Sequence, residues 1–490
     1  MTTQFTYQNK RISNTVILGL SEELEELSQL ELEQQNLVKE LTELEDLNMV
    51  TTDFGRINST LYHLNGQPIR LITVGLGALK EATETTLSRA FGYLFQFLKQ
   101  EKITHADLLY ETLALTDSTE QIAEVIGIQS ERAIYQFDSF KTSEKTAYEL
   151  NVNIIGSDQT FTNSINQGQI IGQSINLARN FSQLPPNILT PAYYAKLIEQ
   201  HFAQSAVEVD IKNGELLERE GFGLIHAVGK GSMHEPALVT LTYHGGPQDA
   251  APIALVGKGI TYDSGGYSIK SKTGMQEMKF DMCGSANVVA MIEAARQLEL
   301  PVNLVGVLAI AENMISDAAM KPDDVFYAHS GESVEVLNSD AEGRLVLGDA
   351  VHYASQFNPK VIMDFATLTG AAIVALGEDK AAVFKNNTET PLNDILTLAE
   401  QYGEALFELP VTQTEQQRIR QSDVADLVNH TNKQGKALFA AAFIGHFAGE
   451  TPHLHFDVAG PATTPVASYN GPKGPTGILV RTIVAWLRSL

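Results

Sequence analysis

The hydrophobic and polar positions of the chain follow two periods in turn, which is typical of an α/β protein. Runs dominated by Val, Ile and Leu predict strands at Thr15–Leu20, Arg70–Gly77, Val207–Ile211, Leu238–Tyr243, Ile253–Val256, Val302–Ile310 and Val361–Phe365. Helical spacing predicts helices at Thr86–Lys99, Gln169–Phe181, Ala192–Phe202, Leu345–Ala354 and Gly474–Leu490. Because the later strands show little alternation, we expect them to be buried on both faces of a mostly parallel sheet with helices on each side.

The segment Ser21–Asp46 is rich in Glu and Leu and predicts a further helix. Ser21 is a suitable N-cap, and Leu24, Leu27, Leu30 and Leu37 recur at helical spacing. A coiled coil is the alternative, but the heptads do not persist. We therefore expect an amphipathic surface helix.

Two polar stretches near the end of the first third of the chain predict a connection between domains. They cover residues 142–146 and 156–168. A chain of 490 residues is long enough for roughly two to four domains. We place an N-terminal α/β domain at 1–160 and a larger α/β domain at 161–490.

A compact group of charges follows the alternating run Val334–Leu337, which predicts a strand. Residues two apart in a strand share a face, so Asp340 and Glu342 are expected to point the same way, before Gly343 lets the chain turn. With Arg344 beside them, these carboxylates are costly to bury unless a divalent metal compensates their charge. An acidic surface turn, with Arg344 pairing locally, is the alternative.

A second charged segment, Lys258–Lys270, follows the apolar run Ile253–Val256. It contains Asp263 between two lysines in a Gly-rich stretch, and Asp281 follows shortly after. Carboxylates near the carboxyl ends of parallel strands meet at one edge of the sheet, where ligand sites of α/β proteins lie. The three acids of the two segments and Asp281 are together enough to hold two metal ions.

These two segments resemble the signature segments of the leucyl (cytosol) aminopeptidase family of dinuclear metallopeptidases, with Ser339 where Thr is more usual. Further matches occur in family order over about residues 165–490: Ala178-Arg179, Leu184–Pro191, Ala311–Met314, Ala366–Ala371, Ser422–Leu427 and Asp457–Gly460. The resemblance implies a smaller N-terminal α/β domain of macro-like fold and a larger catalytic α/β domain. It also implies an enzyme that hydrolyses the first peptide bond of its substrates, releasing leucine and other apolar residues.

The resemblance assigns metal ligands as well. It implies two divalent ions, Mn or Zn, bridged by Asp263 and Glu342. Lys258 and Asp281 would complete one site and Asp340 the other, partly through its backbone carbonyl. An ammonium cannot coordinate a metal, so Lys258 would have to be neutral there, and burial and nearby dications favour that form.

The resemblance further implies that Lys270 stabilises the oxyanion of the reaction and that Arg344 holds a bicarbonate acting as general base. The alternative is that both cations only balance the carboxylates. By family correspondence the first side chain of the substrate is lined by Met278, Thr367, Gly370, Ala459 and Ala462, and Leu368 offers its backbone carbonyl. Ala462 departs from the Met of some members, and Tyr267 from the commoner Ile.

The amino-acid composition limits the kinds of molecule that the protein is expected to bind. Acidic residues outnumber basic ones by 59 to 34, giving a formal charge of −25 that opposes binding to nucleic acid and anionic membranes. One cysteine, Cys283, the polar start Met1–Asn14 and the absence of a long apolar run predict a cytoplasmic protein. Peptides are the expected substrates and a homohexamer is implied by the resemblance. A two-metal phosphoesterase and a DNA-binding member of the same family are the alternative functions.

Overall fold

The computed structural model describes residues 2–490 except 23–29, 115–118, 139, 143–146 and 388. The chain divides into two compact units. The first comprises 1–176, 401–403 and 465–473, and the second comprises 177–400, 404–464 and 474–490. The boundary predicted at 160/161 falls inside one long helix, α4 (Gln159–Gln183).

The first unit is a sheet with helices on both faces. Its six strands are arranged in the order β1-β8-β7-β2-β6-β5, and all neighbours are parallel except β5 and β6. One face packs on α2 and α3, and the other packs on α1 and the hairpin β3–β4. The elements that precede α4 are β1 (Thr2–Tyr7), β2 (Thr15–Ser21), β3 (Glu31–Leu32), β4 (Gln35–Asn36), α1 (Val38–Asp46), β5 (Ile57–Leu64), β6 (Gln67–Gly77), α2 (Glu84–Gln100), β7 (His105–Leu109), α3 (Thr119–Arg132) and β8 (Glu149–Ile155).

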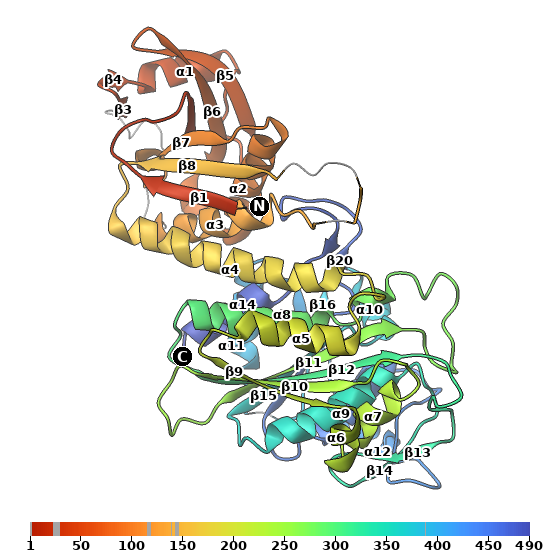
Figure 1. Ribbon diagram of the computed structural model, residues 1–490. Coiled ribbons are helices and arrows are strands. Elements are labelled where there is room, and N and C mark those ends of the chain that lie inside the picture. The colour runs from red at the N-terminus through yellow and green to blue at the C-terminus, as the bar shows by residue number, and fades with distance from the viewer. Residues whose placement is uncertain (1, 23–29, 115–118, 139, 143–146, 388) are drawn as a thin grey trace. The chain divides into compact units, whose positions relative to one another are not determined.

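The second unit is built on an eight-stranded, mostly parallel sheet in the order β17-β16-β19-β15-β11-β12-β10-β9. This confirms the predicted fold class. The strands β19, β15, β11 and β12 are parallel to one another, whereas β10 is antiparallel to both of its neighbours, β12 and β9, and β16 is antiparallel to β19. Helices α5, α8 and α14 lie over one face, and α7 and α9 lie over the other (Figure 1).

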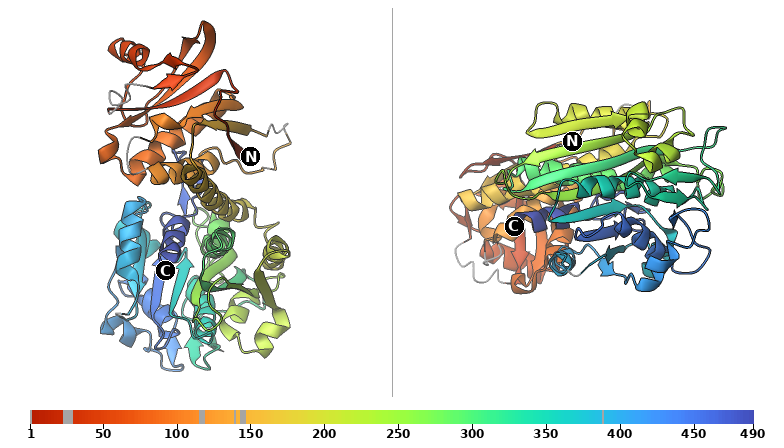
Figure 2. Two further views of the ribbon diagram at one scale, coloured as in Figure 1. Left: turned by 90° about the vertical axis from the view of Figure 1, so that its left-hand side faces the viewer. Right: turned by 90° about the horizontal axis from the view of Figure 1, so that it is seen from below.

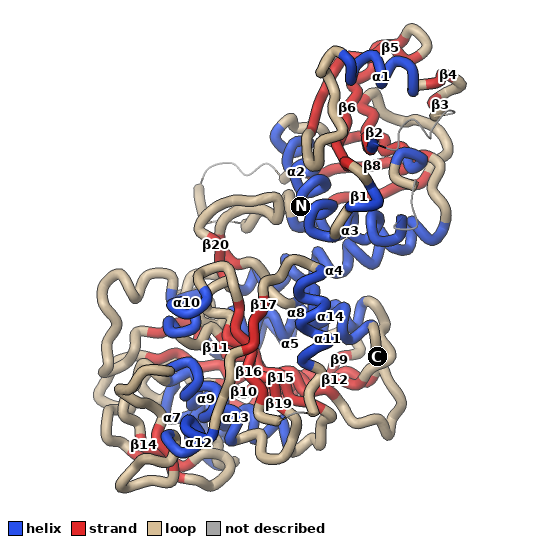
Figure 3. The backbone as a smooth tube through the Cα atoms, turned by 180° about the vertical axis from the view of Figure 1, so that it is seen from behind, coloured by secondary structure: helices blue, strands red, loops and turns tan. Residues whose placement is uncertain are grey.

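The sheet is twisted, as two further views show (Figure 2), and a view from behind shows its strands gathered in the middle of the unit (Figure 3). The helices are α5 (Pro191–Phe202), α6 (Gly214–Arg219), α7 (Gly223–Gly229), α8 (Cys283–Gln297), α9 (Glu342–Ser355), α10 (Gly370–Leu376), α11 (Leu392–Gln401), α12 (Gln413–Arg418), α13 (Lys436–His446) and α14 (Val480–Arg488). The strands are β9 (Val207–Asn213), β10 (Ala237–His244), β11 (Ile253–Asp263), β12 (Asn303–Asn313), β13 (Val325–Tyr327), β14 (Ser333–Glu335), β15 (Val361–Ala366), β16 (Ala381–Lys385), β17 (Leu406–Glu408), β18 (Leu427–Val428), β19 (His453–Asp457), β20 (Thr463–Thr464) and β21 (Gly474–Pro475). Among the described residues, no helix combines the length and apolar content needed to cross a membrane.

The helix predicted at Ser21–Asp46 is wrong at Ser21 and over residues 30–37, as far as the structure describes this range. Ser21 ends β2, residues 31–36 form the hairpin β3–β4, and only Val38–Asp46 is helical. Glu33 and Gln34 turn the hairpin with φ of 53° and 68°. Leu30 and Leu37 are nevertheless buried, so the apolar spacing identified core positions but not the element. Leu24 and Leu27 lie outside the described residues.

The polar stretch predicted as a linker at 156–168 is also mostly helical, since α4 begins at Gln159. The Oδ1 atom of Asp158 accepts a hydrogen bond from the backbone N–H of Phe161 at 2.8 Å, which is the geometry of an N-cap. The polar residues that suggested a loop therefore begin a helix. At the other end of the chain, the helix predicted at Gly474–Leu490 is confined to α14, Val480–Arg488.

A buried ionic group lies inside the sheet of the second unit. The carboxylate of Asp364 on β15 contacts His453 Nε2 at 2.8 Å and His455 Nδ1 at 2.7 Å, both on the neighbouring strand β19. Burial lowers the pKa of His455, but Asp364 outweighs it and raises this pKa overall. The two imidazoles in turn outweigh the effect of burial and lower the pKa of Asp364.

We expect Asp364→Asn to lower the free energy of unfolding by about 3–5 kcal/mol, because it leaves a buried imidazolium without its counter-charge. The raised pKa of His455 contributes stability below its ordinary value of 6.5 that is lost as pH rises through the folded value. The lowered pKa of Asp364 contributes stability above 3.8 that is lost as pH falls. Urea unfolding should therefore show a larger loss near pH 5.5 than near pH 9.

The matched control is Asp379→Asn, which removes an exposed aspartate paired with Lys380. It should leave the urea midpoint unchanged. A loss for Asp364→Asn that is equal at the two pH values would contradict a charged His455.

Candidate active site

The charged segments predicted from the sequence meet at the carboxyl ends of the central strands. β11 continues through Lys258 to Asp263, so both lie on the strand rather than in the Gly-rich loop, which begins at Ser264. β14 ends at Glu335, earlier than predicted; Asp340 lies in a turn and Glu342 begins α9. The prediction that Asp340 and Glu342 lie on one face of a strand is therefore wrong.

Three carboxylates still converge. Oxygen atoms of Asp263, Asp340 and Glu342 lie within 4.8 Å of one another, and no other such group is found among the described residues. The turn at Asp340 and the first turn of α9 bring the carboxylates of Asp340 and Glu342 together, in place of the strand that was predicted to align them. Hard oxygen donors at this spacing fit a divalent cation.

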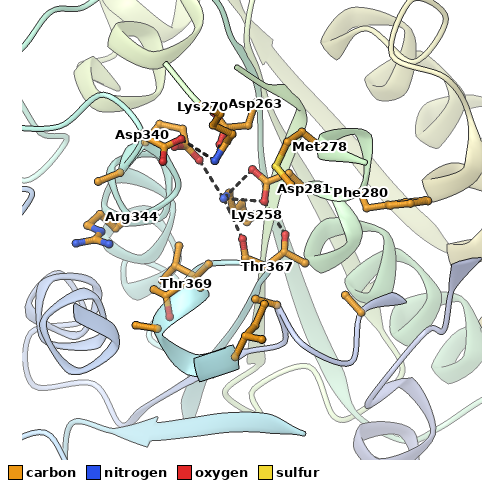
Figure 4. Close-up of a pocket in the computed structure, with 18 of the residues that line it drawn as sticks. Lys258, Asp263, Lys270, Met278, Phe280, Asp281, Asp340, Arg344, Thr367 and Thr369 are labelled. Atoms are coloured by element: carbon orange, nitrogen blue, oxygen red, sulfur yellow. Dashed lines mark hydrogen bonds and ion pairs between the residues drawn. The ribbon is translucent and has the colours of Figure 1, made fainter. Parts of the chain in front are cut away.

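Two lysines occupy the space between these acids (Figure 4). Lys258 Nζ lies 2.8 Å from Asp281 Oδ2 and 3.0 Å from Glu342 Oε1, and it donates to the carbonyl oxygen of Thr367 at 3.1 Å. Lys270 Nζ lies 2.9 Å from Asp263 Oδ2 and 2.6 Å from Asp340 Oδ1. The ammonium groups thus provide the positive charge that the cluster needs.

The buried acids and lysines of the site shift one another's pKa values. Burial and the neighbouring acids raise the pKa of Asp281 to about 8, against the opposing effect of Lys258. Burial lowers the pKa of Lys258, but the carboxylates of Asp281, Glu342 and Asp263 outweigh burial and raise it overall. Lys258 is therefore an ammonium in this arrangement, and it would have to lose a proton to act as a ligand.

The donor set passes a simple test of fit for metal. Asp281 Oδ2 and Asp340 Oδ1 are buried, and each is paired with a lysine ammonium, at 2.8 Å from Lys258 Nζ and 2.6 Å from Lys270 Nζ. Buried carboxylates whose charge is balanced by a nearby cation are suited to coordinating a divalent ion in its place.

Glycines allow these charged groups to approach. Gly343, which was expected to turn the chain, lies inside α9, and a Cβ atom there would lie 2.6 Å from Lys258 Nζ. Gly265 has a φ of 85°, and its Cβ would lie 2.8 Å from Asp340 Oδ1. The first glycine is required by a close approach and the second by both conformation and space.

Ser339 joins the two signature segments. Its hydroxyl donates to the carbonyl oxygen of Gly265 at 2.7 Å and accepts from the backbone N–H of Ser268 at 2.7 Å. These bonds need only the hydroxyl that Ser shares with Thr. The departure from the more usual Thr therefore keeps the contact.

All of the site residues predicted from the sequence line one pocket of about 470 Å³. They are Lys258, Asp263, Lys270, Met278, Asp281, Asp340, Glu342, Arg344, Thr367, Leu368, Gly370, Ala459 and Ala462. In the close-up view, Met278 and Phe280 lie on one side of Lys258 and Arg344 lies on the other (Figure 4). Their chemical roles stay predictions.

Arg344 is buried, with 6% of its surface exposed. Its Nη1 donates to the backbone carbonyl of Asn429 at 2.9 Å, whereas its Nε has no hydrogen-bond partner. Burial lowers its pKa to about 10, against the raising effect of Glu342, Asp457 and Asp340. A guanidinium with an unused donor at a pocket wall is suited to an anion.

Several residues that support the site were given no role from the sequence. Asn313 Nδ2 donates to Asp263 Oδ1 at 2.8 Å and to the carbonyl oxygen of Ser339 at 3.0 Å. Asp457 Oδ2 accepts from Thr369 Oγ1 at 2.6 Å, and Asp457 Oδ1 accepts from the N–H of Leu368 at 3.2 Å. Asn313 and Asp457 lie in the segments Ala311–Met314 and Asp457–Gly460, and their place among the family matches is the sequence signal that marks them.

Eleven other residues that line the pocket were given no role from the sequence. They are Gln276, Glu277, Phe280, Asn338, Ala341, Thr369, Ala371, Ile373, His430, Lys436 and Thr463.

The fold and pocket define an α/β protein with a carboxylate-rich site fitted to divalent cations. Residues 176–484 match the catalytic domain of the cytosol aminopeptidase family, and residues 17–144 match its N-terminal domain. The chain belongs to this family. It is therefore a metal-dependent hydrolase that releases residues from the amino ends of peptides, which leaves the phosphoesterase alternative without support.

Relatives of this family match the chain over most of their length. A probable cytosol aminopeptidase of Exiguobacterium sibiricum is 39% identical over 86% of this chain and 86% of its own. One of Bacillus subtilis is 36% identical over 84% of each chain. A solved structure, the bottromycin maturation enzyme BotP in complex with Mn, superposes with a TM-score of 0.84 at 28% identity, covering 98% of this chain and 99% of that one.

Proposed function

We propose that the enzyme removes leucine and other apolar residues from the amino ends of peptides with the help of two divalent metal ions. The observation that carries this proposal is the convergence of Asp263, Asp340 and Glu342 beside Asp281 and two lysines in a pocket with apolar walls. Membership of the cytosol aminopeptidase family supports the reaction class.

The proposed ligands are those that the resemblance implied. Asp263 and Glu342 would bridge two ions, Lys258 and Asp281 would complete one site, and Asp340 the other. Mn is favoured by its presence in the complex of the structural relative, and Zn suits the same donors. Ions held there would polarise the substrate carbonyl and acidify a water molecule near neutral pH.

The residues of the chain would perform the remaining tasks. Lys270, held between Asp263 and Asp340, would donate a hydrogen bond to the oxygen that gains negative charge during the reaction. Arg344 would hold an anion through its unused Nε, and bicarbonate is the anion that the resemblance implies.

The pocket wall supports a preference for apolar first residues. Met278, Gly370, Ala459 and Ala462 are small or apolar, and Thr367 Oγ1 is occupied by a hydrogen bond to Asp281 Oδ1 at 2.8 Å. A branched or straight aliphatic side chain would therefore meet few unpaired polar groups there. Leu368 would offer its backbone carbonyl to the substrate.

Mass spectrometry of a metal-loaded digest tests the proposed function. A peptide that begins Leu-Val should lose its residues one at a time from the amino end, whereas the same peptide with an acetylated amine should stay intact. Cleavage of the acetylated peptide, or of p-nitrophenyl phosphate instead of peptides, would refute it.

We further infer a homohexamer of this chain, which rests on the resemblance to the family. Static light scattering should give a mass near six times 53.5 kDa. A stable and active monomer would contradict this inference.

A further inference from the structure

The three lysines that line the pocket differ in their pairing. Lys258 and Lys270 each contact two carboxylates within 3.0 Å. Lys436 lines the same pocket, but no ion pair joins it to a carboxylate in the part of the chain that the structure describes. Its positive charge is therefore not neutralised by the protein itself.

The position of Lys436 adds to that charge. It is the first residue of α13, after Gly435 with a φ of 81°, and its side chain is exposed at the rim of the pocket. The amino end of a helix carries a partial positive charge and unpaired backbone N–H groups. The rim at Lys436 thus favours an anion more than an isolated surface lysine would.

Two further groups lie on this side of the pocket. Arg344 bonds the carbonyl of Asn429, the residue next to His430, and His430 lines the pocket. Burial, followed by the charges of Arg344 and Lys436, lowers the pKa of His430 to about 4. His430 is therefore a neutral hydrogen-bonding group at pH 7, placed near two cations.

Arg344, at the cationic end, and Met278, of the apolar wall, lie on opposite sides of Lys258 (Figure 4). With the first side chain of the substrate against the apolar wall and the reacting bond at Lys270, the remaining space faces the part of the substrate that leaves.

We propose that Lys436, assisted by His430, binds a carboxylate on the leaving part of the substrate, so that the enzyme favours peptides whose second residue presents one. This inference rests on the proposed aminopeptidase function. The carboxylate can be the free carboxyl end of a dipeptide or an acidic side chain at the second position. On a chain with a formal charge of −25, a local cation offsets the general repulsion of such anionic substrates.

The effect should be modest and sensitive to salt. An ion pair with an exposed lysine changes kcat/KM by up to about fivefold, and added NaCl screens it. We expect about a three- to fivefold preference for the carboxylate-bearing member of a matched substrate pair.

The experiment compares kcat/KM for two pairs of substrates with the metal-loaded protein. Leu-Gly against Leu-Gly-amide tests the carboxyl end, and Leu-Asp-amide against Leu-Asn-amide tests the side chain. Lys436→Gln should bring the ratio within the preferred pair to about one. Lys433→Gln, which removes an exposed lysine that does not line the pocket, should keep the ratio of the unaltered protein.

Each outcome supports or overturns the proposed role of Lys436. A preference in one pair that Lys436→Gln removes identifies the source of the carboxylate. Equal rates within both pairs, or a preference that survives Lys436→Gln, overturn the inference while the aminopeptidase stands. If none of the four substrates is cleaved, the proposed function itself fails and the inference falls with it.

Discussion

Glu342→Gln is expected to lower kcat for a leucyl amide by about a thousandfold or more, a loss of several kcal/mol of transition-state stabilisation. The side chain begins α9 with 2% of its surface exposed, and its Oε1 lies 3.0 Å from Lys258 Nζ. The amide keeps the size of the carboxylate but removes its negative charge, so two dications would no longer be balanced. Hydrolysis and the metal retained after dialysis should fall together.

Glu400→Gln is the control for this variant, because Glu400 is exposed on α11 and does not line the pocket. It should keep both activity and metal. Full activity of Glu342→Gln with an unchanged metal content would show that Glu342 is not a metal ligand.

Lys270→Ala is expected to lower kcat by about a hundred- to a thousandfold and to leave KM nearly unchanged. The ammonium of Lys270 lies between Asp263 and Asp340, close to the atoms proposed to react, and a hydrogen bond made mainly in the transition state contributes to kcat rather than to binding. Steady-state kinetics at saturating metal give this measurement.

Lys272→Ala, in the same loop but exposed and outside the pocket, should behave like the unaltered protein. The competing interpretation is that Lys270 only balances the acids. In that case Lys270→Ala would change stability without metal, but its kcat at saturating metal would be normal.

The sequence predicted the buried parallel strands of the central sheet because such strands have a distinctive composition, but it did not predict β16 or β17. The strands β11, β12 and β15 coincide with runs of Val, Ile and Leu whose residues are all or nearly all buried. Boundaries were harder to predict: β11 carries Lys258 and Asp263, because charged residues can continue a strand where a site compensates their burial.

The segment 21–46 shows where periodicity fails. Leucines at helical spacing are also compatible with a buried hairpin, and Glu33 and Gln34 adopt the positive φ values that a turn requires. Glu and Gln are not residue types from which a positive φ is predicted. The tertiary packing of Leu30 and Leu37, which the sequence does not display, decided the element.

The candidate site was predictable where its residues correspond to those of the family, and pocket residues outside that correspondence were given no role. Asp340 and Glu342 belong to one octapeptide. Asn313 reaches Asp263 from the neighbouring strand β12, and His430 reaches the pocket from a loop before α13, so only the folded chain brings them to the site. Gly343 was recognised as necessary for a wrong reason, because its closeness to Lys258 depends on the packing of α9 against β11.

The most direct test of the two-metal aminopeptidase is hydrolysis of leucyl p-nitroanilide by protein that has been stripped with a chelator and then loaded with Mn or Zn. The proposal predicts no activity in the stripped protein and recovery as about two equivalents of metal bind. Activity that survives complete removal of metal, or that never returns with either ion, would contradict it.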